Sequence, residues 1–266
     1  MADLKGKVAV VTGASRGVGK GIAEGLAEAG ATVYVTGRSA SRDEPPADRT
    51  VQATARSVDE LGGRGVAVEL DHTNDAAVAE FFAELARRED RLDVLINNAF
   101  QIPNPPVWSG KFWEHPLSVW DDQCGVGLRG YYTSAVYAAP LMIQGDGGLL
   151  VNVSSLGATG YAFSTAYGVG KSGVDRMARD MAIELADYGV AALSLHPGVV
   201  TTEFVLDAIA SGDVQLDLAA AESPRFIGRC IAALAMDPDI MEKTGGNYRV
   251  AELACEYRFT DPDRVR

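Results

Sequence analysis

The segment Val8–Gly19 restricts the possible folds more than any other part of the chain. It opens with the apolar run Val8–Val11, which is typical of a strand buried on both faces. Three glycines follow, and an apolar pattern with helical spacing then begins at Val18. Glycine-rich turns also occur merely to reverse a chain, but a strand, a glycine turn and a helix in direct succession predict a nucleotide-binding unit.

The three glycines have separate expected roles. Gly13 can adopt the positive φ of a tight turn, Gly17 allows backbone to approach a pyrophosphate, and Gly19 allows the helix to lie close to the strand. The first helical turn then offers free N–H groups and a partial positive charge to phosphate oxygens. The predicted phosphate-binding turn comprises Gly13, Ser15, Arg16, Gly17, Val18 and Gly19.

Strand and helix patterns alternate along the rest of the chain, which favours a parallel sheet with helices on both faces. Further strands are expected at Thr32–Thr36, Val66–Leu70, Val94–Ile96, Leu149–Val153, Ala191–Leu195 and Tyr248–Ala251, and a long helix at Trp120–Ile143. We therefore predict an α/β fold in which residues 1–266 form a single domain with a Rossmann-type, doubly wound parallel sheet of about seven strands.

Charge and composition exclude several classes of partner. A net charge of −12 argues against nucleic acid, which needs clustered Lys and Arg. Residues 1–7 leave no room for a signal peptide, and the longest apolar runs, such as Ala135–Ile143, are too short for a membrane span. The cysteines and histidines lack metal-ligand spacing. We expect a soluble, cytoplasmic protein without a metal site.

The end of the second predicted strand indicates the choice of dinucleotide. An acidic residue there would bind the ribose 2′-OH, but this chain has Gly37 followed by Arg38. Arg16 lies in the glycine turn on the same side. Two guanidinium groups without a carboxylate suit a 2′-phosphate, which predicts NADP(H) in preference to NAD(H). The alternative is a pair of solvated surface arginines.

A candidate catalytic group follows the buried strand that ends in Ser154 and Ser155. Tyr167 and Lys171 lie one helical turn apart, so both side chains share a face. A neighbouring ammonium, helped by an oxidised nicotinamide, is expected to bring the phenol pKa down from about 10 toward the working range. Tyr167 would then exchange a proton with a carbonyl or alcohol, and Ser155, or alternatively Ser154, would orient its oxygen.

In order along the chain, the motifs Thr-Gly-x-x-x-Gly-x-Gly, Asn-Asn-Ala, Ser, Tyr-x-x-x-Lys and Pro-Gly all occur. This succession resembles the short-chain dehydrogenase/reductase family. The resemblance implies a catalytic group of Ser155, Tyr167 and Lys171, with Lys171 also holding the nicotinamide ribose. Two positions depart from the usual pattern: Phe100 replaces a glycine after Asn-Asn-Ala, and Gly127 replaces the asparagine that holds a water near the lysine. A subgroup of the family shares both departures.

The resemblance also implies further cofactor contacts. Asp71, directly after the third predicted strand, is expected either to accept a hydrogen bond from the adenine amino group or to cap the next helix. The backbone at Asn98 and Ala99 would pass the ribose. The nicotinamide end would meet Pro197, Gly198, Val200 and Thr202.

Two segments are expected to shape the substrate pocket. Residues 101–116 carry four prolines and two tryptophans, which favours an ordered wall of the pocket or, alternatively, an oligomer contact. Residues 202–217 are expected to form a mobile lid. Trp108, Trp113 and Phe204 are the predicted substrate contacts.

These patterns predict an NADP-dependent oxidoreductase that transfers a hydride between the nicotinamide and a carbonyl or secondary alcohol. Its partner would be a small-molecule substrate, and the chain is expected to form a homodimer or homotetramer. The competing hypothesis, supported by Gly127 and Phe100, is a nucleotide-binding regulatory or scaffold protein with little turnover.

Overall fold

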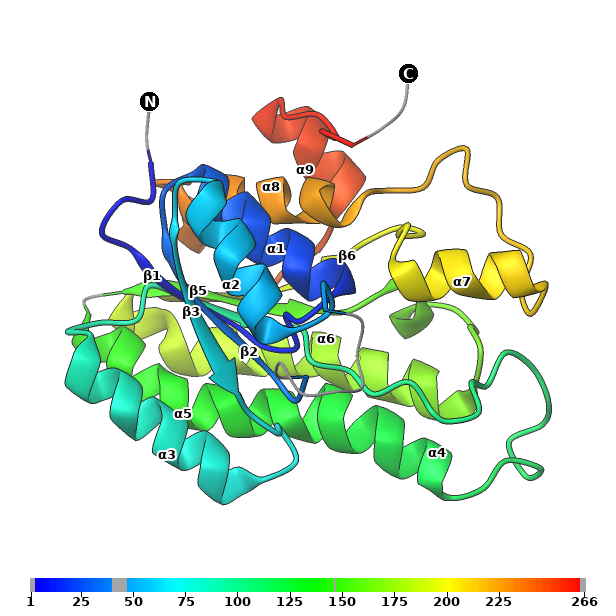
Figure 1. Ribbon diagram of the computed structural model, residues 1–266. Helices are drawn as coiled ribbons and strands as arrows, with labels where there is room; N and C mark the ends of the chain where they lie inside the picture. Colours follow the sequence, from blue (N-terminus) through cyan, green and yellow to red (C-terminus); the bar gives the residue numbers. More distant parts are fainter. Residues whose placement is uncertain (1–2, 40–46, 146, 264–266) are drawn as a thin grey trace.

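The computed structural model describes residues 3–39, 47–145 and 147–263, which contain one seven-stranded sheet (Figure 1). The strand order is β3-β2-β1-β4-β5-β6-β7, and neighbouring strands are parallel. The strands are β1 (Val8–Val11), β2 (Thr32–Gly37), β3 (Arg64–Glu69), β4 (Val94–Asn97), β5 (Gly148–Val153), β6 (Val190–His196) and β7 (Asn247–Arg249). The predicted Rossmann-type sheet is confirmed.

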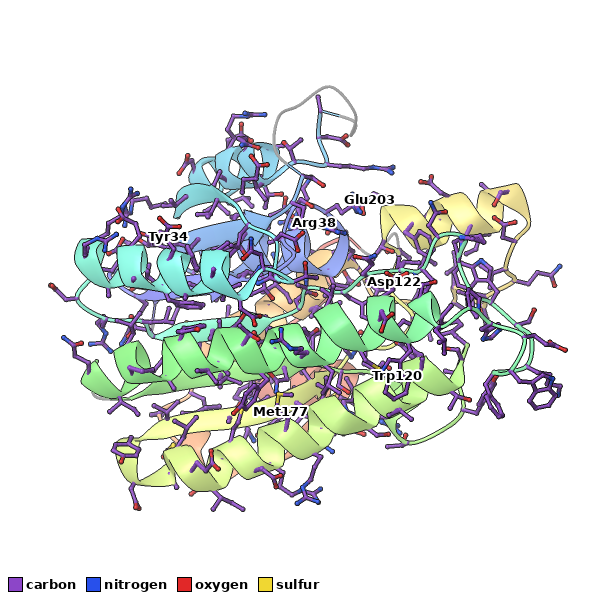
Figure 2. All side chains as sticks on the ribbon, turned by 90° about the horizontal axis from the view of Figure 1, so that it is seen from below. Tyr34, Arg38, Trp120, Asp122, Met177 and Glu203 are labelled. Carbon is purple, nitrogen blue, oxygen red and sulfur yellow. The ribbon has the colours of Figure 1, made fainter. Side chains whose placement is uncertain are left out.

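Helices cover both faces of this sheet, and Figure 2 shows α3, α5 and α6 side by side on one of them. The α-helices are α1 (Gly17–Glu28), α2 (Val51–Glu60), α3 (Asp75–Arg88), α4 (Ser118–Trp120), α5 (Gly130–Gln144), α6 (Thr165–Leu185), α7 (Glu203–Ser211), α8 (Pro224–Ala235) and α9 (Val250–Tyr257). The other helical segments are the π-helical η1 (Asp121–Arg129) and the 3₁₀ turns η2 (Leu156–Ala158), η3 (Ala186–Tyr188) and η4 (Ile240–Lys243).

Alternate side chains of the strands supply two apolar cores. Ala9 and Val11 of β1 pack with α1, α2, α8 and α9 on one face. Val8 and Val10 pack with α3, α5 and α6 on the other. Because both faces are covered, the strand is apolar at every position instead of alternating with polar residues.

The predicted helix over Trp120–Ile143 is divided in the structure. Its N-terminal part is η1, in which π-type turns run for nine residues before α5 begins at Gly130. Gly125 and Gly127 lie in this stretch, and glycine weakens the preference for a regular α-helix. The expected continuous α-helix is therefore wrong over Asp121–Arg129.

The seventh strand and the segment expected as a lid also differ from the prediction. The seventh strand ends at Arg249, because Val250 begins α9. The segment expected as a lid contains α7, which is capped by Thr202: its Oγ1 accepts a hydrogen bond from the N–H of Val205 at 3.3 Å. Residues 202–217 are therefore partly helical, and their mobility stays a prediction.

The order of the strands places a crevice at the carboxyl ends of β1 and β4. From β1 the chain moves to β2 on one side, whereas from β4 it moves to β5 on the other. Such a reversal opens a gap between adjacent connections, where ligands of open α/β sheets bind.

The described ranges contain neither a membrane-spanning helix nor a group of side chains suited to a metal ion. No helix within them is long and apolar enough to cross a membrane. No three side chains of the metal-binding types His, Cys, Asp and Glu within them are grouped so that they could hold an ion.

Candidate active site

The turn after β1 has the backbone that its glycines predict. Gly13 and Gly17 have positive φ angles of 65° and 57°, a region that other residues rarely enter. A Cβ on Gly13 would lie 2.6 Å from Cα of Ala99, and a Cβ on Gly19 would overlap the Gly13 carbonyl oxygen. The three glycines therefore hold the start of α1 close to the ends of β1 and β4.

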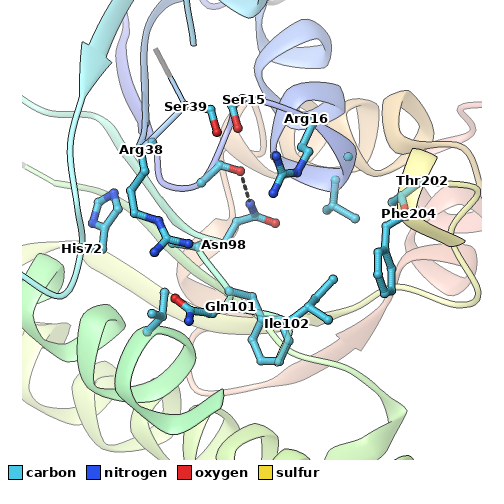
Figure 3. Close-up of a pocket in the computed structure, with 18 of the residues that line it drawn as sticks. Ser15, Arg16, Arg38, Ser39, His72, Asn98, Gln101, Ile102, Thr202 and Phe204 are labelled. Atoms are coloured by element: carbon cyan, nitrogen blue, oxygen red, sulfur yellow. Dashed lines mark hydrogen bonds between the residues drawn. The ribbon is translucent and has the colours of Figure 1, made fainter. Parts of the chain in front are cut away.

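Thr12 and Asn98 fasten this turn to the end of β4. Nδ2 of Asn98 donates to the carbonyl oxygens of Thr12 at 2.9 Å and of Gly13 at 3.1 Å (Figure 3). Oγ1 of Thr12 accepts hydrogen bonds from the backbone N–H groups of Asn98 at 2.8 Å and Ala99 at 3.0 Å. Thr12, to which the sequence analysis gave no role, thus positions two predicted cofactor contacts.

The N-terminus of α1 binds a carboxylate of the chain itself. The N–H of Gly17 donates to Oε2 of Glu203, the first residue of α7, at 3.1 Å. Free N–H groups and the helix dipole attract anions to such a terminus. The turn is therefore able to bind an anionic oxygen, and Glu203 is a second residue that the sequence analysis missed.

The glycine turn forms part of a cavity of about 620 Å³, called here the glycine-turn cavity (Figure 3). Arg16 and Arg38 are exposed and extend into it from two sides (Figure 3). Within its described lining, these arginines are the cations, and Asp71 and Glu203 are the carboxylates. The remaining predicted contacts in this lining are Gly13, Ser15, Gly17, Val18, Gly19, Asn98, Ala99 and Thr202.

Asp71 lies in the same lining but does not cap α3. Asn74 is the cap, because its side chain accepts the N–H of Ala77 at 3.1 Å, so the capping alternative for Asp71 is wrong. Asp71 instead accepts hydrogen bonds from the N–H of Thr73 at 2.9 Å and its hydroxyl at 2.8 Å. Burial opposes ionisation of Asp71, yet these bonds and the charge of Arg38 prevail, so its pKa is lowered. Asp71 is therefore an ionised acceptor at the cavity wall.

Tyr167 and Ser155 form a hydrogen-bonded pair. The Tyr167 hydroxyl donates to Oγ of Ser155 at 2.9 Å, and the same oxygen accepts the N–H of Gly157 at 3.0 Å. Ser154 is buried and donates from Oγ to the carbonyl oxygen of Lys171 at 3.3 Å. Of the two serines that the sequence left open, Ser155 is the one that contacts the phenol.

Lys171 is 7% exposed and lies beside this pair. Its Nζ donates to the carbonyl oxygen of Val153 at 3.0 Å. The Nζ atom lies 5.1 Å from the ring centre of Phe100, 5.9 Å from that of Tyr167 and 6.0 Å from that of Tyr131. The ammonium is thus enclosed by three aromatic rings at the end of β5.

Burial changes the acidity of both catalytic candidates. It raises the pKa of Tyr167 above 10.0, and the hydrogen bond with Ser155 opposes only part of that rise. It lowers the pKa of Lys171 to about 8, while the charge of Asp175 acts in the opposite direction. The expected lowering of the phenol pKa is therefore wrong for the protein by itself. A phenol that keeps its proton is nevertheless suited to act as an acid.

Ser155, Tyr167 and Lys171 open into a second cavity of about 430 Å³, called here the aromatic cavity. Val18 and Asn98 line both cavities, so the two adjoin at the glycine turn. The catalytic candidates and the phosphate-binding candidates therefore lie in two adjoining parts of one crevice.

Aromatic rings from three separate segments close the aromatic cavity. Trp108 stacks on Phe204 of α7 with centroids 5.5 Å apart and an interplanar angle of 20°. It meets Phe163, which precedes α6, edge to face at 5.7 Å. Trp108 and Phe204 thus line the cavity as predicted, whereas Trp113 is 68% exposed and lies outside the described lining. Only part of the 101–116 segment forms a wall.

The turn after β6 reaches the same cavity. Pro197, Gly198, Val200 and Thr202 all line it. The N–H of Gly198 donates to Oε2 of the buried Glu222 at 2.9 Å, which holds the turn from behind. The predicted nicotinamide contacts are therefore brought together at one place.

Known proteins are similar to this chain in sequence and in fold. The family model for short chain dehydrogenases matches residues 7–210. Dehydrogenase/reductase SDR family member 1 of Mus musculus is 43% identical over 99% of this chain and 85% of its own length, and the Homo sapiens protein of that name is 41% identical over 98% and 85%. A solved short chain dehydrogenase of Mycobacterium thermoresistibile has a TM-score of 0.82 at 27% identity, covering 98% of this chain and 90% of that one.

These matches confirm the family that the order of motifs along the chain predicted. A family model that covers most of the chain and relatives that align over nearly all of it lead to one assignment. The chain belongs to the short-chain dehydrogenase/reductase family, whose members are oxidoreductases that bind a nicotinamide cofactor.

Proposed function

We propose that this protein transfers a hydride between NADP(H) and a carbonyl or secondary alcohol. The observation that carries the proposal is the Tyr167 hydroxyl, bonded to Oγ of Ser155 at 2.9 Å on the wall of the aromatic cavity, with the Lys171 ammonium beside it. A proton donor, an orienting hydroxyl and a neighbouring cation are the groups that carbonyl reduction requires.

The glycine-turn cavity supports a dinucleotide with a 2′-phosphate. The N–H of Gly17 already binds an anionic oxygen, as a pyrophosphate requires. Arg16 and Arg38 would bind the 2′-phosphate through charge-assisted hydrogen bonds, and the ionised Asp71 would accept one from the adenine. The remaining contacts would come from Ser15, Asn98, Ala99 and Lys171 toward the riboses, and from Pro197, Gly198, Val200 and Thr202 toward the nicotinamide. When bound, the cofactor supplies or accepts the hydride.

In the direction of reduction, Tyr167 would give its phenolic proton to the carbonyl oxygen as the carbonyl is reduced to the alcohol. Ser155 donates a hydrogen bond to the same oxygen and orients it. Lys171 stabilises the phenolate that remains on Tyr167 through its positive charge. The raised pKa of Tyr167 keeps the proton in place until this step.

The aromatic cavity limits the class of substrate. Within its described lining, Lys171 is the one charged side chain, and rings such as Trp108 and Phe204 supply much of the wall. A cationic substrate would lose its hydration there without gaining a counter-ion, and an anionic one would meet only the Lys171 ammonium, which the catalytic group uses. We therefore propose uncharged, largely apolar ketones and secondary alcohols as substrates.

One observation favours a second candidate, a nucleotide-binding regulatory or scaffold protein. Gly127 has no side chain to hold the water that related enzymes place near the lysine, so turnover would be slow. Titration with NADPH and NADH, followed by a screen of apolar ketones for loss of nicotinamide absorbance, separates the two. Ketone-dependent oxidation of NADPH supports the oxidoreductase. Binding of NADPH without turnover of any ketone favours the second candidate.

We also propose that the chain forms a homodimer or homotetramer. Apolar side chains remain exposed on two neighbouring helices, Tyr132 and Val136 on α5 and Val169 and Ile183 on α6. Extended apolar surface of this kind is seldom left open in monomers. Light scattering should give a multiple of the chain mass of 28.1 kDa, and a mass of 28.1 kDa in dilute solution would contradict the proposal.

A further inference from the structure

Phe100 and Gly127, the two departures from the usual family pattern, form a single packing arrangement. A Cβ on Gly127 would lie 2.7 Å from Cδ2 and 3.2 Å from Cε2 of the Phe100 ring. Gly127 is not among the residues with positive φ, so its backbone does not require glycine. A larger side chain at position 127 would therefore force the Phe100 ring out of its present position.

The same ring contacts both members of the catalytic pair. Its centre lies 5.1 Å from Nζ of Lys171, the shortest of the three ring distances around that ammonium. It meets the Tyr167 ring edge to face, with centroids 5.8 Å apart and an interplanar angle of 88°. Within the described residues, the Lys171 ammonium has one hydrogen-bond acceptor, the carbonyl oxygen of Val153. Phe100 thus faces a cation that has few other partners.

We propose that Phe100 is a positioning residue for proton transfer: seated on Gly127, its ring holds Lys171 beside Tyr167 and stabilises the charged ammonium through a cation–π interaction. Such interactions gain strength when the cation is removed from water, as it is here. The ring then takes over part of the task that related enzymes give to an asparagine and its water. The catalytic part of this inference rests on the proposed function, whereas the effect on the ammonium does not.

The other groups around Lys171 leave its charge finely balanced. Tyr167 and Asp175 lie on its own helix, and Tyr131 faces it from α5. Asp175 raises the pKa of Lys171, but its carboxylate also binds Nε2 of His196 in β6 at 3.0 Å. Nδ2 of Asn247 in β7 donates to the same carboxylate at 3.2 Å. Burial lowers the pKa to about 8, so modest stabilisation of the ammonium changes its charged fraction near neutral pH.

The charge of Lys171 can be measured without turnover. In cofactor-free protein with carbon-13 in its lysines, the Cε resonance of Lys171, assigned by its loss in Lys171→Met, is followed against pH. Phe100→Leu keeps an apolar side chain of similar size but removes the π face, and it should lower the titration midpoint by roughly 0.5–1 pH unit. Phe100→Tyr keeps a ring and should leave the midpoint near that of the unmodified protein. An unchanged midpoint in Phe100→Leu would show that Phe100 only fills space and would overturn the proposal.

A double-mutant cycle tests the arrangement by activity. Gly127→Asn alone forces its Cβ against the ring and should lower kcat/KM for an apolar ketone by about tenfold or more. Adding Phe100→Gly frees that space and restores the glycine and asparagine of the usual family pattern. The kcat/KM of the double variant should therefore be higher than the value obtained by multiplying the two single losses. Independent, multiplicative losses would contradict the proposal. Absence of turnover in the unmodified protein would contradict the proposed function alone, because the titration above would still decide the role of Phe100.

Discussion

The glycine-turn cavity and the aromatic cavity adjoin, but they are built in different ways. The first is made by backbone at the ends of adjacent strands, where Gly13 and Gly19 approach other main-chain atoms too closely for any side chain. The second is closed by rings of Trp108, Phe163 and Phe204, which come from distant segments and meet only in the folded chain. Under the proposed function, cofactor binding would thus be tied to the core of the sheet, whereas substrate choice would depend on side chains that can change without moving a strand.

The largest effect is expected for Tyr167→Phe, which should slow the chemical step without weakening cofactor binding. Tyr167→Phe retains the ring and its packing against Phe100 but removes the proton donor. We expect kcat for ketone reduction to fall by about 10²–10⁴-fold, while the Kd for NADPH changes by at most about threefold. Stopped-flow absorbance and fluorescence titration measure the two quantities. Retention of more than about a tenth of the activity would remove Tyr167 from its proposed role.

A change in the glycine turn should weaken cofactor binding instead of slowing the chemical step. Gly13→Ala combines a strained φ with a contact of 2.6 Å to Cα of Ala99, and such strain costs about 1–3 kcal/mol. We expect the Kd for NADPH to rise by about 10–100-fold and the Tm to fall. Gly160→Ala is the matched control, because a Cβ there would meet nothing within 4 Å. Equal Kd values for NADPH in the two variants would contradict the proposed role of the turn in cofactor binding.

Arg38→Asp tests which dinucleotide the glycine-turn cavity accepts. The change removes a cation from the described lining and adds a carboxylate suited to a ribose 2′-OH. We expect the Kd for NADPH to rise by about 10–100-fold and that for NADH to fall. Arg56→Asp, at an exposed position of α2 outside that lining, should leave the ratio unchanged. Unaltered selectivity in Arg38→Asp would refute the 2′-phosphate assignment.

The rate of reduction should depend on pH because Lys171, in the lining of the aromatic cavity, has a pKa of about 8. As the pH rises through about 8, the Lys171 ammonium loses its proton, and the phenolate formed on Tyr167 loses its stabilising charge. We expect kcat/KM to fall by roughly tenfold for each further pH unit. A profile that stays flat between about pH 7 and 9 would show that the charge of Lys171 does not contribute.

The smallest expected effect concerns the aromatic wall. Trp108→Leu removes the stack on Phe204 and the edge contact with Phe163. We expect KM for apolar ketones to rise by about tenfold while the Kd for NADPH stays unchanged. Trp113→Leu, at a position that is 68% exposed, should alter neither. Equal KM values for the two tryptophan variants would remove the distinction between the wall and the exposed part of that segment.

The parts of this molecule that sequence predicts well are those coded by neighbouring residues. The run Val8–Val11 and the glycines after it define a strand and a turn locally, and the alternation of patterns then implies a parallel sheet. The four-residue spacing of Tyr167 and Lys171 similarly places both on one face of α6. The choice between Ser154 and Ser155 needed the structure, because only the fold shows which hydroxyl meets the phenol.

The remaining features depend on contacts between distant segments. The π-helical turns of η1 bring Gly127 against Phe100; the glycines of this stretch weaken a regular α-helix but do not specify π-helical turns. The contact between Glu203 and Gly17 likewise joins α7 to α1 across the crevice. In the cofactor-free protein the pKa of Tyr167 is raised by burial, which the spacing of Tyr167 and Lys171 does not reveal.

The central claim is that the crevice joins a hydride donor to a proton donor. Incubation of the protein with NADPH carrying deuterium at C4 and an apolar aryl ketone tests it most directly, with mass spectrometry of the product. We expect an alcohol with one deuterium on the carbinol carbon, and no such product from Tyr167→Phe on the same time scale. NADPH that binds but leaves every ketone unlabelled and unreduced would contradict the account.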